Sequence, residues 1–573
     1  MSTSGAETPN GDGSVNGHGG AHMLAAAQAH GVQALFTLSG AHVFPLYDAA
    51  VGGPSGYDAA GRDNSSALRS GPLRLVDTRH EATAVFAAEG TAKLTRTPGF
   101  AAITAGPGVT NGMSAIASAH FNGVPMLVVG GRAPAFRWGT GALQEIDHVP
   151  LVAPITKAAS TLTDPQTIGA DTEAAFATAA APHRGPVFVD VPMDRFYTPA
   201  QAAAPVRTAG EPVAPDPEAV ATIAALLARA ERPLLILGSD VWMGGAEVAA
   251  LNFAEMTGVP VITNGMARGV LPRGHRLLVT RARGAAFAGT DVVIVAGTPL
   301  DFRLGYGMFG EPPAPVVHLA DSPDQLSDHA GPVATAAGDL AMMFEALALA
   351  WSAKASTDRY RPWAEQLRAT ADAAVAKDAA MLTSDSDPVH PARIYGELLP
   401  RLTDDTVVIG DGGDFVSFAG RFIEPARPGH WMDPGPFGCL GTGLGYAIAS
   451  GLAHPGSPTV LLLGDGAAGF SLMDVDTLVR HNIPTVMIMG NNGAWGLEKH
   501  PMRLLHTYDV AADLQPGLRY DEVVTALGGA GELVTEPAAI GPAIDRAMNS
   551  GVPYLVNVVT DPEAAYPRST TGL

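Results

Sequence analysis

Cysteine, basic residues and long apolar runs are all scarce in this sequence of 573 residues. Its single cysteine, Cys439, excludes a framework of disulfide bonds and any zinc site built from several cysteines. Lys and Arg number 35 against 56 Asp and Glu, so the formal charge is −21 and nucleic acid is not an expected partner. No run of about 18 uncharged apolar residues occurs, so we expect no membrane-spanning helix.

The remaining composition is that of an ordinary globular enzyme. The chain is 47% hydrophobic and 16% charged, which excludes wholesale disorder, collagen and coiled coil. Its length suggests about three domains. Residues 1–20 lack the basic and apolar segments of a signal peptide, so we interpret them as a flexible tail and expect a cytoplasmic protein.

Three stretches of the chain alternate short apolar runs with Ala-rich helical segments, at residues 21–197, 218–353 and 385–565. This alternation predicts an α/β fold with three doubly wound parallel sheets. Residues 198–217 are rich in Ala, Pro and Thr without an apolar period, which indicates a linker. The predicted strands are residues 34–38, 101–104, 125–129 and 186–191, then 233–237, 259–262 and 291–296, then 406–409, 459–463, 485–489 and 554–559.

Two short motifs follow apolar runs in the third stretch. Gly464-Asp465-Gly466 comes after one predicted strand and Asn491-Asn492 after the next. The carboxyl ends of parallel strands are where such sheets bind ligands. Asp465 and Asn492 offer the oxygen atoms that Mg²⁺ prefers. Gly466 and the small Ala467 and Ala468 let main-chain N–H groups approach a diphosphate at a helix N-terminus.

This combination resembles the thiamine diphosphate-dependent enzymes, in the branch that contains pyruvate oxidase and pyruvate decarboxylase. The resemblance implies pyrimidine-binding, middle and diphosphate-binding domains, in that order. It implies thiamine diphosphate and Mg²⁺ as cofactors, with the Ala494 carbonyl as a further metal ligand. It also implies a homodimer or homotetramer with active sites at the subunit interface.

Glu81 matches the glutamate that assists the cofactor in this family. It follows Arg79-His80 and begins an Ala-rich segment. A carboxyl group beside the aminopyrimidine ring stabilises its imino tautomer, which removes the thiazolium C2 proton. The alternative is that Glu81 has only a structural role, because the helix dipole favours an acidic side chain in the first turn of a helix.

Other segments match the family's cofactor-binding loops. Asn111 ends Gly106-Pro107-Gly108-Val109-Thr110-Asn111, and Gly438-Cys439-Leu440-Gly441 precedes a Gly/Ala-rich segment. In relatives the Leu440 position wedges the cofactor into a bent shape, and the Gly438 carbonyl accepts a hydrogen bond from its amine. An ordinary core leucine is the alternative for Leu440. Gly413 and Asp414, in Gly410-Asp411-Gly412-Gly413-Asp414, are further expected diphosphate contacts.

Three features point to an acyl-CoA substrate. Residues 141–148, which contain Gln144, resemble oxalyl-CoA decarboxylases and 2-hydroxyacyl-CoA lyases, and in part acetolactate synthases. Residues 301–307 follow a strand of the domain on which relatives bind an adenine nucleotide or a flavin, so ADP is a candidate ligand there. Residues 566–573 resemble a C-terminal lid, with a frayed terminus as the alternative. The candidate CoA contacts are Arg283, Arg303, Tyr566 and Arg568.

Glu498 and His42 are the candidate acid–base residues. Glu498 lies six residues after Asn492, at the position of a glutamate in 2-oxo-acid decarboxylases. A surface glutamate beside Lys499 is its alternative. His42 lies on a strand-end loop that is close to the thiazolium ring in relatives, with a solvated loop histidine as the alternative.

We therefore expect a thiamine diphosphate-dependent lyase that cleaves the C1–C2 bond of a 2-hydroxyacyl-CoA. The products would be formyl-CoA and a ketone or aldehyde, and 2-hydroxyisobutyryl-CoA is a candidate substrate. The alternatives are an oxalyl-CoA decarboxylase or an acetolactate synthase, whose flavin would colour the protein yellow. A more remote alternative is a non-catalytic, nucleotide-sensing relative.

Overall fold

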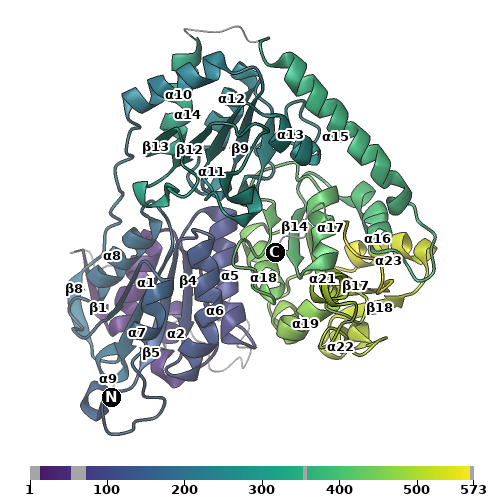
Figure 1. Cartoon of the computed structure of the whole chain (residues 1–573). Helices are drawn as coiled ribbons and strands as arrows, with labels where there is room; N and C mark the ends of the chain where they lie inside the picture. The colour runs from purple at the N-terminus through teal and green to yellow at the C-terminus, as the bar shows by residue number, and fades with distance from the viewer. Residues whose placement is uncertain (1–12, 53–71, 353–357, 568–573) are drawn as a thin grey trace.

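The computed structural model describes residues 13–52, 72–352 and 358–567, which form three α/β units. Figure 1 shows the first unit in purple and blue, the middle unit in teal and the third in green and yellow. Each unit contains a parallel sheet with helices on its faces, as the sequence predicted. The long helix α15 (Arg361–Leu382) runs along the outside from the middle unit to the third.

The first unit has a six-stranded sheet in the order β3-β2-β4-β5-β7-β6, with every pair parallel. Its central strands are fully buried, because helices cover both faces. The strands are β2 (Ala34–Thr37), β3 (Arg74–Asp77), β4 (Gly99–Ile103), β5 (Met126–Arg132), β6 (Ala158–Thr161) and β7 (Pro186–Pro192). The helices are α1 (Gly19–Ala29), α2 (Phe44–Val51), α5 (Glu81–Thr95), α6 (Pro107–Phe121), α7 (Val149–Val152), α8 (Ile168–Ala180) and α9 (Met193–Phe196).

The third unit repeats this topology, with strands in the order β15-β14-β16-β17-β19-β18. The strands are β14 (Val407–Asp411), β15 (Trp431–Met432), β16 (Thr459–Gly464), β17 (Val486–Asn491), β18 (Ala530–Val534) and β19 (Tyr554–Val559). The helices are α16 (Pro391–Leu398), α17 (Asp414–Phe422), α18 (Thr442–Ala453), α19 (Asp465–Ser471), α20 (Val475–Arg480), α21 (Gly496–His506), α22 (Tyr520–Ala526) and α23 (Pro537–Asn549).

The middle unit has a five-stranded parallel sheet in the order β10-β9-β11-β12-β13. The strands are β9 (Pro233–Leu237), β10 (Val261–Thr263), β11 (Val292–Ala296), β12 (Val316–Ala320) and β13 (Ala334–Ala337). The helices are α10 (Pro217–Arg229), α11 (Ser239–Met243), α12 (Glu247–Thr257), α13 (Arg283–Gly289) and α14 (Leu340–Ser352).

Two segments expected to be irregular are partly ordered as strands. β1 (Ser14–Gly17) pairs antiparallel with β8 (Ala200–Ala203), and α1 begins at Gly19. The tail prediction is therefore wrong for residues 14–17, 19 and 20, and the linker prediction is wrong for residues 200–203; residues 1–12 lie outside the described part of the chain. A ribbon of four-residue strands depends on main-chain hydrogen bonds and has no apolar period to reveal it.

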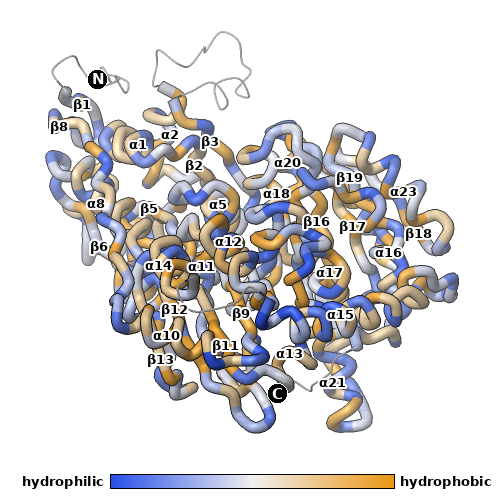
Figure 2. Tube along the Cα trace, turned by 90° about the horizontal axis from the view of Figure 1, so that it is seen from above, coloured by the Kyte–Doolittle hydropathy of each residue, from blue (hydrophilic) through white to orange (hydrophobic). Residues whose placement is uncertain are grey.

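The first and third units share one apolar core. α5 packs on α18, and a continuous buried cluster includes Phe86 of the first and Tyr446 of the third. The middle unit joins them through Trp242, whose Nε1 donates to the Lys93 carbonyl at 2.6 Å. Apolar segments, orange in Figure 2, lie among the strands of each unit.

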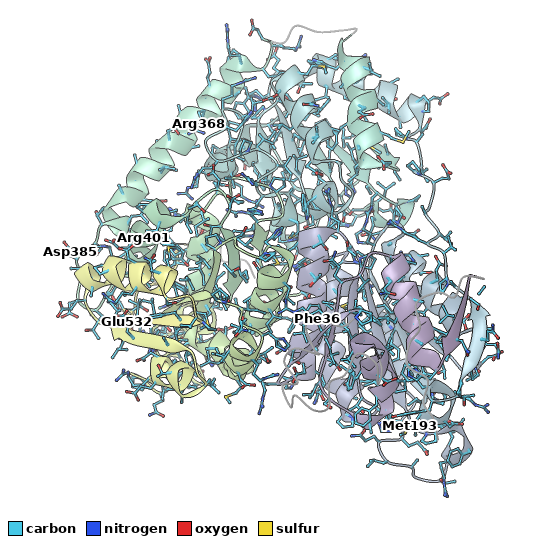
Figure 3. All side chains as sticks on the ribbon, turned by 180° about the vertical axis from the view of Figure 1, so that it is seen from behind. Phe36, Met193, Arg368, Asp385, Arg401 and Glu532 are labelled. Atoms are coloured by element: carbon cyan, nitrogen blue, oxygen red, sulfur yellow. The ribbon has the colours of Figure 1, made fainter. Side chains whose placement is uncertain are left out.

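Charged side chains lie mostly on the periphery. Figure 3 labels Arg368, Asp385, Arg401 and Glu532 there, whereas Phe36 lies within the first unit. In the described part of the chain, no helix has the length and apolar character needed to cross a bilayer.

Candidate active site

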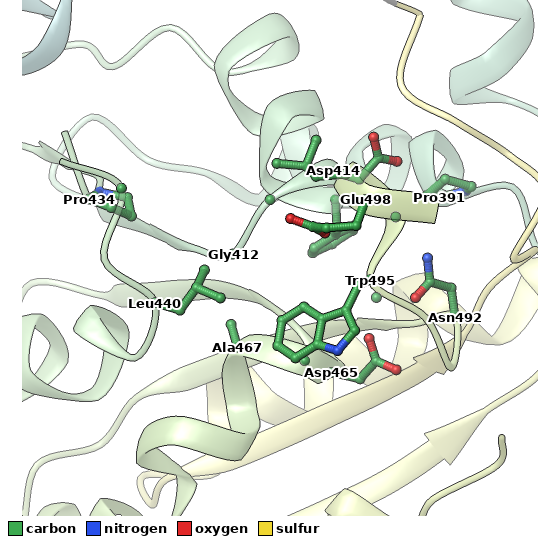
Figure 4. A pocket seen from close by; sticks show the side chains of 18 of the residues that line it. Pro391, Gly412, Asp414, Pro434, Leu440, Asp465, Ala467, Asn492, Trp495 and Glu498 are labelled. Atoms are coloured by element: carbon green, nitrogen blue, oxygen red, sulfur yellow. The ribbon is translucent and has the colours of Figure 1, made fainter. Parts of the chain in front are cut away.

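A cavity of about 380 Å³ lies at the carboxyl ends of β14, β16 and β17. Helices α17, α19 and α21 begin at its wall (Figure 4). It brings together most of the residues predicted for the diphosphate-binding domain. Those that line it are Gly413, Asp414, Gly438, Leu440, Asp465, Gly466, Ala467, Asn492, Ala494 and Glu498.

Asp465 and Asn492 are neighbours because their strands are neighbours. Gly464 at the end of β16 pairs with Gly490 of β17. The Asp465 carboxylate accepts from the Gly493 N–H at 2.8 Å, and the Asn492 amide oxygen accepts from the Ala494 N–H at 3.1 Å. Burial raises the pKa of Asp465 to about 6. Within the described residues this carboxylate has no ion-pair partner, which is the arrangement that a bound cation would complete.

Two glycines at the cavity wall are required by close packing. A Cβ on Gly466 would lie 2.5 Å from the Trp495 ring, and one on Gly413 would lie 2.5 Å from the Leu497 side chain. Main-chain N–H groups at the start of α19 can therefore approach a ligand directly. Ala468, predicted beside them, packs in the apolar core and is absent from the cavity lining.

Leu440 faces the cavity rather than the core. Its side chain is half-buried, and Figure 4 shows it beside Ala467 on one wall. The start of the following helix α18 is held by Asp411, whose carboxylate accepts from the N–H groups of Gly441 and Gly443 at 3.0 and 2.9 Å. Burial raises the pKa of Asp411 to about 6.

Glu498 lies in the first turn of α21, with its carboxylate pointing into the cavity (Figure 4). The neighbouring Lys499 pairs with Asp513 at 2.6 Å. Glu498 itself has no ion-pair partner among the described residues. Glu498 is also exposed, so a surface glutamate beside Lys499 remains the alternative to a catalytic role.

The predicted residues of the first unit gather at the carboxyl edge of its own sheet. Glu81 begins α5, is 7% exposed, and accepts a hydrogen bond from the Asn111 amide at 3.1 Å. His42 Nδ1 lies 3.0 Å from the Thr104 hydroxyl oxygen, and burial lowers the pKa of His42.

Gln144 lies against the Gly106 backbone, with a φ of 60°. Among the residues described for one chain, Glu81, Asn111, His42 and Gln144 do not line the cavity of the third unit. One subunit therefore presents the two halves of the predicted site on separate sheet edges.

The candidate CoA contacts are scattered. Arg303 lines the cavity but is paired with Asp301 at 2.7 Å. Arg283 donates to the Arg303 carbonyl and lies over the Phe287 ring, and it lines none of the cavities described here.

The C-terminal segment approaches the cavity. The Tyr566 N–H donates to the Asp414 carboxylate at 3.1 Å, and its ring packs edge-on against Phe418. Asp561 and Ala564 line the cavity. Residues 568–573, which include Arg568 and most of the predicted lid, lie outside the described residues.

Sequence reasoning missed several lining residues. Asn264 and Gly265 follow β10 of the middle unit, and a strand-end position was the signal that could have found them. Trp495 stands three residues after the predicted ligand Asn492 and forms the floor beside Gly466.

Comparison with known proteins agrees with this geometry. Residues 17–151, 220–347 and 411–558 match the N-terminal TPP-binding, central and C-terminal TPP-binding domains of thiamine pyrophosphate enzymes. The chain is 48% identical to "Acetolactate synthase large subunit IlvG" of Mycobacterium tuberculosis, over 96% of this chain and 97% of that protein. The chain belongs to the thiamine pyrophosphate enzymes.

Other relatives of this thiamine pyrophosphate enzyme are named for a different activity. It is 34% identical to "2-hydroxyacyl-CoA lyase 2" of Homo sapiens, over 83% of this chain and 79% of the human protein. It is 32% identical to "2-hydroxyacyl-CoA lyase 2" of Caenorhabditis elegans, over 91% and 85% of the two chains. The comparisons therefore support the acetolactate synthase alternative more strongly than the lyase expectation.

The residues of this thiamine pyrophosphate enzyme fit its cofactor. A buried carboxylate without a cationic partner, an amide oxygen and the Ala494 main chain form a donor set of the kind that Mg²⁺ accepts. The glycine-lined wall beside them leaves space for a diphosphate. Asp465, Asn492 and Ala494 would hold the metal, and Gly413, Gly466 and Ala467 would contact the diphosphate.

Proposed function

We propose that this thiamine diphosphate enzyme uses Mg²⁺ and forms or cleaves a carbon–carbon bond next to a carbonyl group. When bound, the cofactor supplies a nucleophilic carbon and then stabilises the negative charge left by bond cleavage. Glu81, held by Asn111, would stabilise the imino tautomer of the cofactor. Two substrate classes are candidates.

Condensation of 2-oxo acids, as in acetolactate synthases, has the stronger support from similarity. The relative named for that activity shares 48% identity across nearly the whole chain, against 34% for the human lyase. An enzyme of this kind must bind the negatively charged carboxylate of each substrate.

Cleavage of a 2-hydroxyacyl-CoA is the second candidate, and the charge of the cavity favours it. Besides Asp465, which would hold the metal, the acidic residues Asp414, Asp433, Glu498 and Asp561 line the cavity, whereas Arg303 is the one arginine among its described lining residues. Because Asp301 already neutralises Arg303, a substrate carboxylate would find little attraction on this wall. A thioester carries no such charge at its reacting carbon.

Glu498 supplies the base that cleavage requires. A 2-hydroxyl group must lose its proton as the adjacent carbon–carbon bond breaks. Glu498 lies at the cavity wall without a salt-bridge partner in the described chain, so its carboxylate is available for that proton. His42, held against Thr104 in the other half-site, is the second candidate base.

A product assay separates the two substrate classes. The protein is supplied with thiamine diphosphate, Mg²⁺ and either pyruvate, 2-hydroxyisobutyryl-CoA, other 2-hydroxyacyl-CoAs or oxalyl-CoA, and products are identified by mass. Acetolactate from pyruvate supports the first candidate, and formyl-CoA with a ketone or aldehyde supports the second. Turnover of oxalyl-CoA alone, or of none of them, would refute both.

The Glu498→Gln variant tests the proposed base. Loss of a general base costs about 10²–10⁴ in rate, so cleavage should slow by that order while cofactor affinity stays unchanged. Exchange of the cofactor C2 proton should persist, since Glu81 assists that step. Cleavage at near-parental speed would remove Glu498 from the mechanism.

The second cavity is our proposed site for the nucleotide part of a ligand, ADP or CoA. It has a volume of about 540 Å³ and lies between the first and middle units. Lys157 and Arg184 line it and suit phosphate groups, while Asp324 suits ribose hydroxyls. A flavin in the same place would colour the purified protein yellow, and mass spectrometry of the released ligand distinguishes these cases.

We further propose that the active unit is a homodimer, which pairs into a tetramer. In one chain the Glu81 half-site and the Asp465 half-site lie on separate sheet edges, so a second copy is needed to complete each active site. Phe136 and Leu143, in the loop beside Gln144, are strongly exposed in the single chain and suit such a covered face.

A further inference from the structure

Residues 433–440, the wedge segment, connect β15 to the loop before α18, and five of them line the cavity: Asp433, Pro434, Gly435, Gly438 and Leu440. Within the third unit, the Asp433 carboxylate accepts from the Trp431 indole N–H at 2.8 Å and from the Gly435 N–H at 2.9 Å. These bonds hold the beginning of the segment. The end of the segment is held within the unit at Gly441, whose N–H donates to Asp411, and the part between is contacted by the first unit.

Two side chains of the first unit hold main-chain carbonyls of the wedge segment. Lys93 of α5 donates to the Asp433 carbonyl at 3.3 Å, and Asn122, just after α6, donates to the Pro434 carbonyl at 3.3 Å. Gly435 has a φ of 69°, and a Cβ there would lie 1.8 Å from the Asn122 amide oxygen. Glycine at this position thus permits the close approach of the two units.

Two further contacts flank Gly438. The rings of Phe121, at the end of α6, and Phe437 stack with centroids 4.9 Å apart and planes within 6° of parallel. The Cys439 thiol donates to the Ser114 carbonyl of α6 at 3.4 Å. Contacts with α6 therefore occur on both sides of Gly438, which lines the cavity.

The donors that reach the wedge segment are themselves fixed by Glu89, which is fully buried. Its Oε1 accepts from Lys93 at 3.0 Å and from Asn122 at 2.8 Å. Lys93 also donates to the Tyr446 hydroxyl oxygen at 2.7 Å. A buried network of this kind has few alternative arrangements, because each broken bond leaves a polar group without a partner.

We propose that α5 and the end of α6 form a seat that positions the Gly438–Leu440 wall of the cofactor cavity, with Asn122 and Phe121 as positioning residues. The seat and the wall belong to one chain but to different units. Docking the segment before the cofactor binds removes the cost of ordering it during binding. The proposal rests on thiamine diphosphate as the cofactor and is independent of the substrate class.

The test compares Asn122→Ala with Ser118→Ala. Both changes remove a hydrogen bond to Glu89 Oε1, because Ser118 donates to it at 3.3 Å, but only Asn122 also reaches the wedge segment. Thiamine diphosphate binding in Mg²⁺ is measured from quenching of tryptophan fluorescence, since Trp495 lines the cavity. NMR measures C2 proton exchange of the bound cofactor.

Asn122→Ala should weaken cofactor binding about tenfold, a change of about 1.4 kcal/mol, and slow the exchange. Ser118→Ala should bind within about twofold of the parent. If both variants weakened cofactor binding equally, the effect would come from the Glu89 network as a whole, and the proposed role of the seat would be refuted.

Phe121→Ala provides a second route, because this ring is about half exposed and its loss does not threaten the fold. It should weaken binding in the same direction as Asn122→Ala, with the melting temperature within about 2 °C of the parent. Parental cofactor affinity and exchange in the Phe121→Ala variant would refute the proposal, even if Asn122→Ala proved unstable.

Discussion

Lys93 is a lysine that the fold has buried almost completely, with its side chain only 2% exposed. Its ammonium group contacts the Glu89 carboxylate at 3.0 Å and the Tyr446 hydroxyl oxygen at 2.7 Å. Lys93→Met keeps most of the side-chain length and removes the charge. Glu89 would then remain buried without its counter-ion, and its Oε2 already lacks a hydrogen-bond partner among the described residues.

Breaking a buried ion pair by removing one partner costs about 3–5 kcal/mol. Asn122 and Ser118 still donate to Glu89 in the variant, so we expect a loss near the lower end, about 3 kcal/mol. The double variant Glu89→Gln, Lys93→Met removes both charges together, and its loss should be smaller than that of Lys93→Met alone. With the Glu89→Gln single variant measured as well, the coupling energy of the pair is the loss in the double variant minus the sum of the two single losses.

Thermal unfolding of the protein without cofactor at pH 7 measures the effect. At about 2–4 °C per kcal/mol for a unit of this size, Lys93→Met should lower the melting temperature by roughly 6–12 °C. Arg361→Lys is a control, because Arg361 is 63% exposed and pairs with Asp358 on the surface at 3.5 Å, so this change should alter the value little. A Lys93→Met variant within about 2 °C of the parent, or a double variant less stable than the single one, would refute this reasoning.

Three further predictions concern the active site. Gly466→Val should weaken thiamine diphosphate binding at least about tenfold in a fluorescence titration, because its Cβ would meet the Trp495 ring at 2.5 Å; parental affinity would contradict the close packing. The folded pKa of Asp411, about 6, lies above its unfolded value, so the parent should gain stability relative to Asp411→Asn as the pH falls from about 6 to 4. The melting temperatures of the parent and of Asp411→Asn are measured at pH 7 and 4.5. If their difference were the same at both pH values, the predicted pH dependence would be wrong. Mixing inactive Glu81→Gln with inactive Asp465→Ala should restore activity after subunit exchange if each active site spans two chains, whereas verified exchange without recovery would exclude that assembly.

The α/β architecture and the third-unit half of the site could be predicted from local sequence. Gly464-Asp465-Gly466 and Asn491-Asn492 each follow an apolar run, and this local pattern predicts a strand end without any information from the rest of the chain. Glu81 could be placed at a helix start, where α5 begins. The ribbon of β1 and β8 could not be predicted, because four-residue strands joined by main-chain bonds carry no pattern in their side chains.

Side-chain direction and long-range partners were decided only by the tertiary structure. From sequence, Leu440 could be a core residue or part of the cavity wall, and Glu498 could be a surface residue or an active-site base. In the structure both residues line the cavity, because α18 and α21 begin at the sheet edge where the cavity lies. The contact between Asn122 and Pro434 joins residues 312 positions apart. No local period encodes such a contact, because it depends on how α5 and α18 pack between two units that each fold around their own sheet.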